Sequence, residues 1–256
     1  MIDKTEFLRF SDIMINGRGK MSDTSPTMKS YTKEKIIFLI DLFIELEKKS
    51  LIKKLSPEEK FRFDKEVNDS LQNIADLNKL RADYARIIKN RPPSNSDRIK
   101  FKDEIGNELE ITMTQYVIHY GITYSALCEL MKFIMVKIID FDKITKKHMD
   151  GIGAIKKTLK ENEFPIGFFW DIDNRLRNSF FHMDFVLKNE DNGRIYCDFT
   201  PEIYSSEPWS SFSWRKSEDN SQKDYIKITD LFWQSMNADL STFALIGCFV
   251  YMMKII

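Results

Sequence analysis

The sequence predicts a mainly α-helical protein: a helical bundle with one or two short β-hairpins, preceded by an N-terminal helical region. Apolar residues recur at helical spacing over several long segments, which is typical of amphipathic and buried helices. Alternating apolar and polar residues flank a turn signal at only two places, and each indicates a short hairpin. Apolar residues make up 43 % of the 256 residues and charged residues 30 %, which are ordinary values for a globular protein with one good-sized core.

The N-terminal third of the chain divides at residue 30. Residues 16–30 are polar and rich in Gly and Ser, so we expect residues 1–30 to form a flexible lead-in. A helical region is expected over residues 31–98. Within it, Ser56-Pro57-Glu58-Glu59 is a capping box with Pro at the first helical position, which predicts a helix beginning there. The prolines of RPPSNS at 91–96 end that helix.

The main helical domain is expected over residues 99–256. Its first element is a predicted hairpin over 99–112, where apolar and polar residues alternate around Gly106-Asn107. A second hairpin is expected where FVLK and RIYCDFT flank NEDNG. The remaining elements are helices at about 113–141 and 143–161, a helix that follows Pro165 and ends near Asp184, and a final helix from about Asp230.

Charge and cysteine content exclude several classes of protein. Lys+Arg and Asp+Glu both number 39, so the zero net charge argues against a general nucleic-acid coat or a membrane-surface binder. The three cysteines are odd in number and far apart, which indicates a reducing cytoplasm. They form no C-x-x-C pair, so a zinc site is not expected. No apolar signal region opens the sequence, so secretion is not expected. We therefore predict a cytoplasmic protein without a metal or cofactor.

Residues 240–256 form an apolar stretch with a single charged residue, Lys254. At 17 residues the stretch falls short of the roughly 20 needed to cross a bilayer. We interpret it as a terminal helix buried between neighbours, and a membrane tail anchor is the alternative.

Most local motifs do not match a known catalytic or nucleotide-binding pattern. GIGAIK at 151–156 lacks the third glycine of a dinucleotide fingerprint and is better interpreted as a helix–helix turn. The sequence contains no Walker lysine motif, no G-x-S-x-G and no H-E-x-x-H. His119, flanked by Ile118 and Tyr120, is expected to be a core or interface histidine.

The stretch NRLRNSFFHMDF, residues 174–185, is different because its polar residues are not needed for packing. On a helical wheel, one side collects a complete core face: Phe169, Ile172, Leu176, Phe180, Met183 and Leu187. The opposite side collects Asp171, Arg175, Asn178 and His182, with Arg177 between the two. In a purely structural interpretation, Arg177 would form a surface salt bridge with Asp173.

This segment resembles the HEPN superfamily (higher eukaryotes and prokaryotes nucleotide-binding). The resemblance covers roughly residues 112–200 and depends on the pattern R-N-x-x-x-H, from Arg177 to His182, in a late helix followed by a hairpin. Family members are typically metal-independent endoribonucleases that act as dimers, with paired motif helices forming one cleft. The resemblance therefore implies a homodimer that cleaves RNA, with catalytic Arg177 and His182 supported by Asn178.

The residue types suit this chemistry. An imidazole that titrates near neutrality can deprotonate a 2′-hydroxyl or protonate a departing 5′-oxygen. A guanidinium suits the negative charge that gathers on the phosphorus oxygens in the transition state. A symmetric dimer would supply two copies of His182, one as base and one as acid. Asn178 is four residues before His182 and can orient its ring.

Other residues are weaker candidates for contacts with RNA. Arg175 shares the wheel sector of His182 and would serve either as an extra phosphate contact or, in place of Arg177, as the principal arginine. Lys156, Lys157 and Lys160 would form a phosphate track if their helix flanks the cleft, and otherwise a solvated face. Aromatic residues in the Ser-rich segment 200–224 would either stack on bases or pack against the main domain: Trp209, Phe212 and Trp214.

The resemblance also implies a role in defence or growth control, as a toxin restrained by an inhibitory partner protein. Two other classes of function remain open. One is a non-catalytic HEPN-like module that dimerises or binds a nucleotide or RNA through this helix. The other is a membrane-tethered accessory protein held by residues 240–256.

Overall fold

The computed structural model describes residues 3–16, 26–89, 95–169, 172–181, 185–190, 194–199, 215–216 and 224–255. Over these residues the chain is mainly helical, as predicted. The helices are α1 (Lys4–Asn16), α2 (Pro26–Lys48), α3 (Pro57–Lys89), α4 (Asn95–Ile138), α5 (Ile152–Glu161), α6 (Asn174–Phe181) and α7 (Ile228–Ile255). Two single 3₁₀ turns, Phe141–Lys143 and Gly167–Phe169, lie between them.

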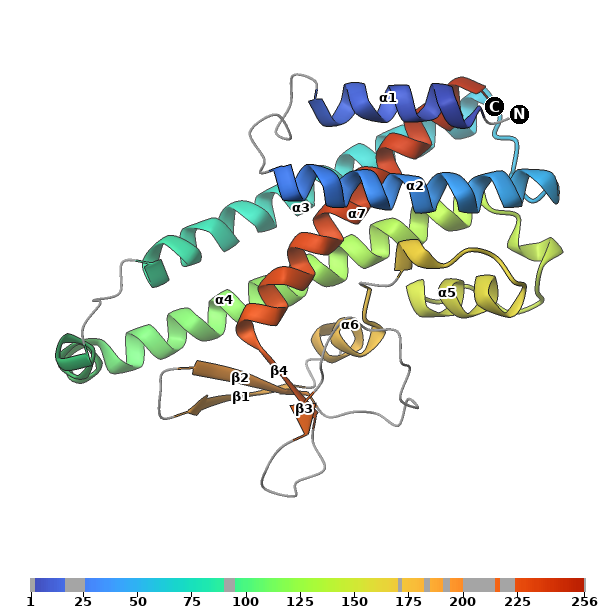
Figure 1. Cartoon of the computed structure of the whole chain (residues 1–256). Coiled ribbons are helices and arrows are strands. Elements are labelled where there is room, and N and C mark those ends of the chain that lie inside the picture. Colours follow the sequence, from blue (N-terminus) through green and yellow to red (C-terminus); the bar gives the residue numbers. More distant parts are fainter. Residues whose placement is uncertain are drawn as a thin grey trace.

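The long helices α2, α3, α4 and α7 form the body of the molecule (Figure 1). α4 packs against α3 on one side and α7 on another, while α7 also packs against α2. The short helices flank this body, with α1 over α2 and α7, and with α5 and α6 against α4. The two termini lie at the same end of the molecule (Figure 1).

A single hydrophobic cluster joins all seven helices. It contains, among others, Phe7, Leu39, Phe63, Tyr124, Ile155, Leu176 and Met252. Aromatic pairs tie distant segments together within it, since the Phe63 ring meets that of Phe249 with centroids 4.2 Å apart. The expected boundary between residues 98 and 99 falls inside α4. The N-terminal helices and the main domain therefore share one core.

The N-terminal lead-in is shorter than predicted. Residues 4–16 form α1, so the expectation of a flexible segment over 1–30 is wrong there; residues 17–25 lie outside the described residues. Asp3 caps α1, because its carboxylate accepts hydrogen bonds from the backbone N–H groups of Thr5 (2.8 Å) and Glu6 (3.2 Å). Phe7 is buried against Tyr251 of α7, with ring centroids 4.5 Å apart. α1 therefore packs on α7, near the other end of the chain, as well as on the neighbouring helix α2.

The hairpin predicted over 99–112 is replaced by a continuous helix. α4 runs from Asn95 to Ile138 and includes Gly106 and Asn107. Helix formation is cooperative, so the helix-forming residues on both sides of Gly106 continue the helix through it, despite the roughly 1 kcal/mol by which glycine disfavours a helix interior. An isolated two-stranded hairpin gains less, because it is marginally stable without further strands.

The helix predicted at 143–161 begins only at Ile152. α4 is terminated by the segment after α2: the Lys53 N–H donates to the Ile138 carbonyl and the Asp140 N–H to that of Leu51, both at 2.8 Å. The chain then passes through a 3₁₀ turn and an irregular connection to Gly151, the N-cap of α5. GIGAIK therefore marks the start of a helix after a connection.

Four strands form one antiparallel sheet in the order β1-β2-β4-β3: β1 (Phe185–Glu190), β2 (Arg194–Phe199), β3 (Arg215–Lys216) and β4 (Asp224–Lys227). β1 and β2 pair from Phe185–Phe199 to Glu190–Arg194 and follow α6 directly in the sequence. β4 leads without a break into α7. Trp209, Phe212 and Trp214 lie outside the described residues.

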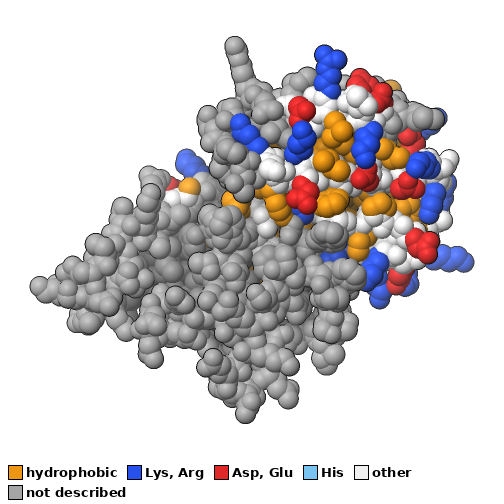
Figure 2. Space-filling model, in the orientation of Figure 1, with side chains coloured by type: hydrophobic (Ala, Val, Ile, Leu, Met, Phe, Trp, Pro, Cys, Tyr) orange, Lys and Arg blue, Asp and Glu red, His pale blue; other side chains and the backbone are white. Residues whose placement is uncertain are grey.

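α7 combines a membrane-like composition with a buried position. Its residues Gln234–Met253 are long and apolar enough to cross a bilayer, although most side chains of this stretch are buried within the bundle. Helices α1, α2 and α4 cover it. This packing favours the interpretation of residues 240–256 as a buried helix. On the face shown in Figure 2, acidic and basic side chains are interspersed over the described helices, with apolar side chains between them.

Candidate active site

α6, the helix that carries Arg177 and Asn178, is capped by Asp173. The Asp173 carboxylate accepts a hydrogen bond from the Leu176 N–H at 3.2 Å. The backbone of Asp173 is held in turn by Tyr124 of α4, whose hydroxyl accepts from the Asp173 N–H (2.8 Å) and donates to its carbonyl (3.1 Å). Burial raises the pKa of Tyr124 well above its usual value, so the phenol stays protonated and can serve both bonds.

A glycine brings α6 close to α4. A Cβ atom at Gly121 would lie 1.8 Å from the ring of Phe180, so this ring rests directly on the α4 backbone. The Ser125 hydroxyl adds a hydrogen bond to the carbonyl of Arg177 at 3.4 Å. The core-face residues Leu176 and Phe180 are both buried, as the helical wheel predicts. α6 is therefore fixed on α4 before any ligand binds.

Two side chains in the described part of the chain hold the guanidinium of Arg177. Its Nη1 donates to the Asn178 side-chain oxygen at 2.9 Å, and its Nη2 forms an ion pair with Glu129 of α4. The Arg177 side chain is 14 % exposed, while Glu129 is 36 % exposed. The arginine thus lies at the edge of the α4–α6 contact, partly open to solvent.

Glu129 connects Arg177 to a second cation. Its other carboxylate oxygen accepts from the Lys132 ammonium at 2.9 Å, and Lys132 also donates to the Asp150 carbonyl at 3.0 Å. Burial by itself would raise the pKa of Glu129, but the hydrogen bonds from Lys132 and Arg177 outweigh it and lower that pKa. The carboxylate is therefore ionised at neutral pH. We call Glu129, Lys132, Arg177 and Asn178 the ionic cluster.

The structure brings together two of the three predicted catalytic residues. Arg177 and Asn178 are in direct contact, whereas His182 and the side chain of Arg175 lie outside the described residues. The Asp173 carboxylate, the expected partner of Arg177 in the structural interpretation, caps α6.

The three candidate lysines of α5 are not equivalent. Lys156 is only 7 % exposed, so it fits a packing role better than a place on a phosphate track. Lys157 and Lys160 are exposed, and Lys157 lies 4.0 Å from Glu161 on the same helix. α5 also approaches α6 closely, because a Cβ atom at Gly153 would lie 2.2 Å from the Asn174 side chain.

Sequence reasoning missed the residues of α4 that support α6. Glu129 is 48 residues from Arg177, and no local spacing connects them. Tyr124 and Gly121 lie in an apolar helix, and no sequence motif distinguishes them from the residues around them. The i, i+3 spacing of Glu129 and Lys132 was readable from the sequence, but such pairs are frequent on helices.

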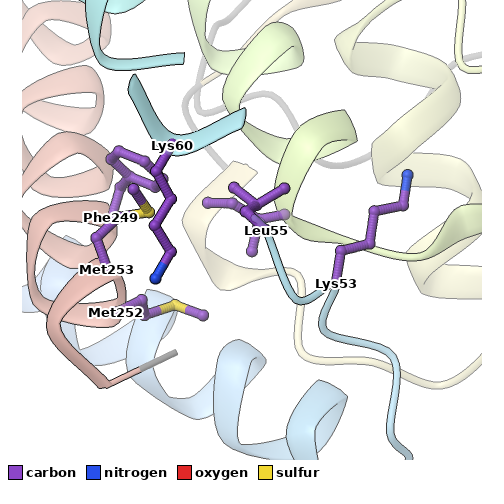
Figure 3. A pocket seen from close by; sticks show the side chains of 7 residues that line it. Lys53, Leu55, Lys60, Phe249, Met252 and Met253 are labelled. Atoms are coloured by element: carbon purple, nitrogen blue, oxygen red, sulfur yellow. The ribbon is translucent and has the colours of Figure 1, made fainter. Parts of the chain in front are cut away.

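A hollow lies at the C-terminal end of α4, beyond the part of this helix that contacts α6. It is lined by Lys53, Leu55, Lys60, Ile138, Phe249, Met252 and Met253, and encloses about 240 Å³ including its open mouth. In Figure 3 the ammonium of Lys53 points away from this space, whereas the Lys60 side chain extends toward Met252. The lining is apolar apart from the two lysines and offers no pair of acid–base groups.

Among the described residues, no group of three or more His, Cys, Asp and Glu side chains could hold a metal ion. No protein-family model, curated protein or solved structure matches the chain. Fold and site together define a mainly helical protein with an ionic cluster between a long central helix and a short capped one.

Proposed function

We propose that the protein is a metal-independent endoribonuclease of the HEPN type that acts as a homodimer. Arg177 and His182 are its catalytic residues, and Asn178 supports them. The observation that favours this function is the contact between Asn178 and the Arg177 guanidinium on a helix fixed to α4. A preorganised cation is what stabilisation of a phosphoryl transition state requires.

In the proposed reaction, the 2′-oxygen attacks the adjacent phosphorus and the 5′-oxygen leaves. His182 of one protomer removes the 2′-proton, and the partner's His182 protonates the leaving oxygen. Arg177 stabilises the negative charge on the non-bridging oxygens. The products are a 2′,3′-cyclic phosphate and a 5′-hydroxyl, and an isologous contact of two motif helices supplies both histidines.

The proposal includes a HEPN-like arrangement of the helices around the motif. α6 is the motif helix of a HEPN-like bundle, α4 is the helix that it packs against, α7 packs on α4, and the β1–β2 pair follows the motif. A cytoplasmic role in defence or growth control, with an inhibitory protein as partner, is part of the same hypothesis.

A second candidate is a non-catalytic module that dimerises or binds nucleotide or RNA through α6. It is favoured by the engagement of Arg177 with Glu129 and Asn178 and by the low exposure of its side chain. Such a residue could serve the stability of an interface without taking part in chemistry.

RNA cleavage in EDTA tests the proposal. We compare the wild type with His182→Ala, Arg177→Gln and the matched control His148→Ala, an exposed histidine of the α4–α5 connection. Loss of one acid–base group is expected to slow cleavage by about 10²–10⁴-fold. The control should cleave normally, and cleaved ends should carry cyclic phosphate.

The mass of each variant in solution must be measured in parallel, because loss of the dimer would also abolish cleavage. Lost cleavage with an intact dimer supports the endoribonuclease. No cleavage of varied RNAs by the wild type, or equal cleavage by His182→Ala, would favour the non-catalytic module.

A further inference from the structure

We propose that Glu129 occupies the place of an RNA phosphate in the free protein, and that Arg177 and Lys132 form the phosphate-binding pair that RNA uncovers by displacing it. This inference rests on the proposed function, because it names RNA as the ligand of the same site. It adds to the proposed site a second cation, Lys132, and a carboxylate, that of Glu129, which competes with the RNA phosphate for the two cations.

The geometry of the ionic cluster is that of a filled anion site. The two oxygens of Glu129 are shared between two cations, one bound to Arg177 and the other to Lys132 at 2.9 Å. A phosphodiester also presents two charged oxygens, and guanidinium and ammonium groups bind carboxylate and phosphate in similar ways. Replacement of one anion by the other leaves both cations paired.

The cations are positioned independently of Glu129. Asn178 holds the Nη1 of Arg177, and the Asp150 carbonyl accepts from Lys132. Displacement of Glu129 would therefore leave Arg177 and Lys132 each with a remaining hydrogen bond. The site does not depend on the carboxylate for its shape.

The carboxylate is accessible enough to leave. The side chains of Glu129 and Lys132 are 36 % and 28 % exposed, so the released carboxylate can reach water by rotating its side chain. The pair of Glu129 with Lys132 contributes little net free energy at this exposure, because water solvates the separated charges well. A polyanion that brings several phosphates can compete with such a pair, whereas a single phosphate gains little.

If Glu129 only positions Arg177, the change in RNA affinity caused by Glu129→Gln should have the opposite sign. If the carboxylate only oriented Arg177, then Glu129→Gln would weaken RNA binding, since the guanidinium would lose its orientation. If it is a competitor, the same substitution strengthens binding. The direction of the change therefore separates the two roles.

The test is the binding of a fluorescent single-stranded RNA with 2′-O-methyl groups, which cannot be cleaved, measured by anisotropy in EDTA. For Glu129→Gln we expect binding about three- to ten-fold tighter than for the wild type. We also expect the slope of log K against log salt to become steeper by about 0.7, the value for one more phosphate contact on a single strand. In the wild type, RNA displaces the Glu129 carboxylate from Arg177 and Lys132, so this contact releases no salt ion and adds nothing to the slope.

Glu45→Gln is the matched control. Glu45 forms an i, i+3 ion pair with Lys48 on α2 and is 41 % exposed, so its loss changes the net charge equally but far from the cluster in the sequence. The gain of Glu129→Gln should exceed that of the control and should disappear when Arg177→Gln is added. Lys132→Gln should weaken binding.

An unchanged or weaker affinity of Glu129→Gln, or a gain equal to that of Glu45→Gln, would overturn the inference. An equal gain for a 5′-mononucleotide would also overturn it, because the site would then be one for free nucleotides. Since the probe cannot be cleaved, the tighter RNA binding of Glu129→Gln can be observed even if the wild type has no ribonuclease activity. In that outcome the proposed catalysis fails while the phosphate site stands.

Discussion

Gly121 decides how closely the candidate active site approaches the central helix. Its hydrogen atom leaves room for the Phe180 ring, which a methyl group would meet at 1.8 Å. On the same stretch of α4, the Tyr124 hydroxyl holds the backbone of Asp173. Both residues act on Arg177 from a distance, by fixing the helix on which it lies.

We expect Gly121→Ala to lower the free energy of unfolding by about 1–3 kcal/mol, because the added methyl overpacks the α4–α6 contact. This loss would occur although alanine is the better helix former. Urea denaturation followed by circular dichroism measures the change.

A double-mutant cycle provides the control. In a Phe180→Ala background the ring is absent, so adding Gly121→Ala should be neutral or stabilising by up to about 1 kcal/mol. If Gly121→Ala destabilises both backgrounds equally, the clash with Phe180 is not the cause.

At the scale of elements, local hydrogen bonds set where helices begin. At the start of α3 the Glu59 carboxylate accepts from the Ser56 N–H at 2.7 Å, and the Ser56 hydroxyl accepts from the Glu59 N–H at 3.2 Å. These two bonds confirm the capping box predicted from the sequence. The hydrogen bonds from Ser56 lower the pKa of Glu59.

We expect Ser56→Ala to destabilise the protein by about 1 kcal/mol, as loss of an N-cap hydroxyl typically does. Ser70→Ala is the control, since the Ser70 hydroxyl donates only to the Glu66 carbonyl within the same helix and its loss should change stability by less than about 0.5 kcal/mol.

The pH dependence of this cap has a defined sign. Because the pKa of Glu59 is lower in the folded state than its ordinary value of 4.5, the ionised carboxylate stabilises the fold at neutral pH. This contribution should fade as the pH falls from 4.5 through the folded pKa. The difference in stability between the wild type and Glu59→Gln, followed from pH 7 to pH 3, measures it.

At the scale of the whole molecule, the helices share one core. Cys128 of α4 and Cys248 of α7 are both buried in it. Burial raises the pKa of the Cys128 thiol to about 12 and that of Cys248 well above its usual value. Neither thiol is ionised near neutral pH, so neither should react with an alkylating reagent in the folded protein.

In a Cys197→Ser background, we expect Cys128 and Cys248 to be alkylated by iodoacetamide at pH 8 only as the protein unfolds. Both should then become reactive at the same urea concentration, because one core unfolds cooperatively. Peptide mapping by mass spectrometry measures each site. Labelling of Cys248 alone in native buffer would contradict the packing of α7 within the bundle.

The sequence by itself determined what depends on neighbours a few residues apart. The capping box at Ser56, the final helix and the core face of Leu176 and Phe180 all follow from hydrogen bonds and periodicity within one or two helical turns. The contact between Arg177 and Asn178 was not predicted, because the four-residue spacing paired Asn178 with His182 and adjacent helix residues do not normally face each other.

Only the tertiary structure decided the rest. The Gly106-Asn107 turn signal lies within the continuous helix α4 and not in a hairpin. The predicted flexible lead-in contains α1, where Phe7 packs on Tyr251. Arg177 forms an ion pair with Glu129, which is 48 residues earlier in the chain. The physical reason is the same in each case: packing places groups together that are far apart in sequence, and no local pattern encodes which of many apolar or charged residues will meet.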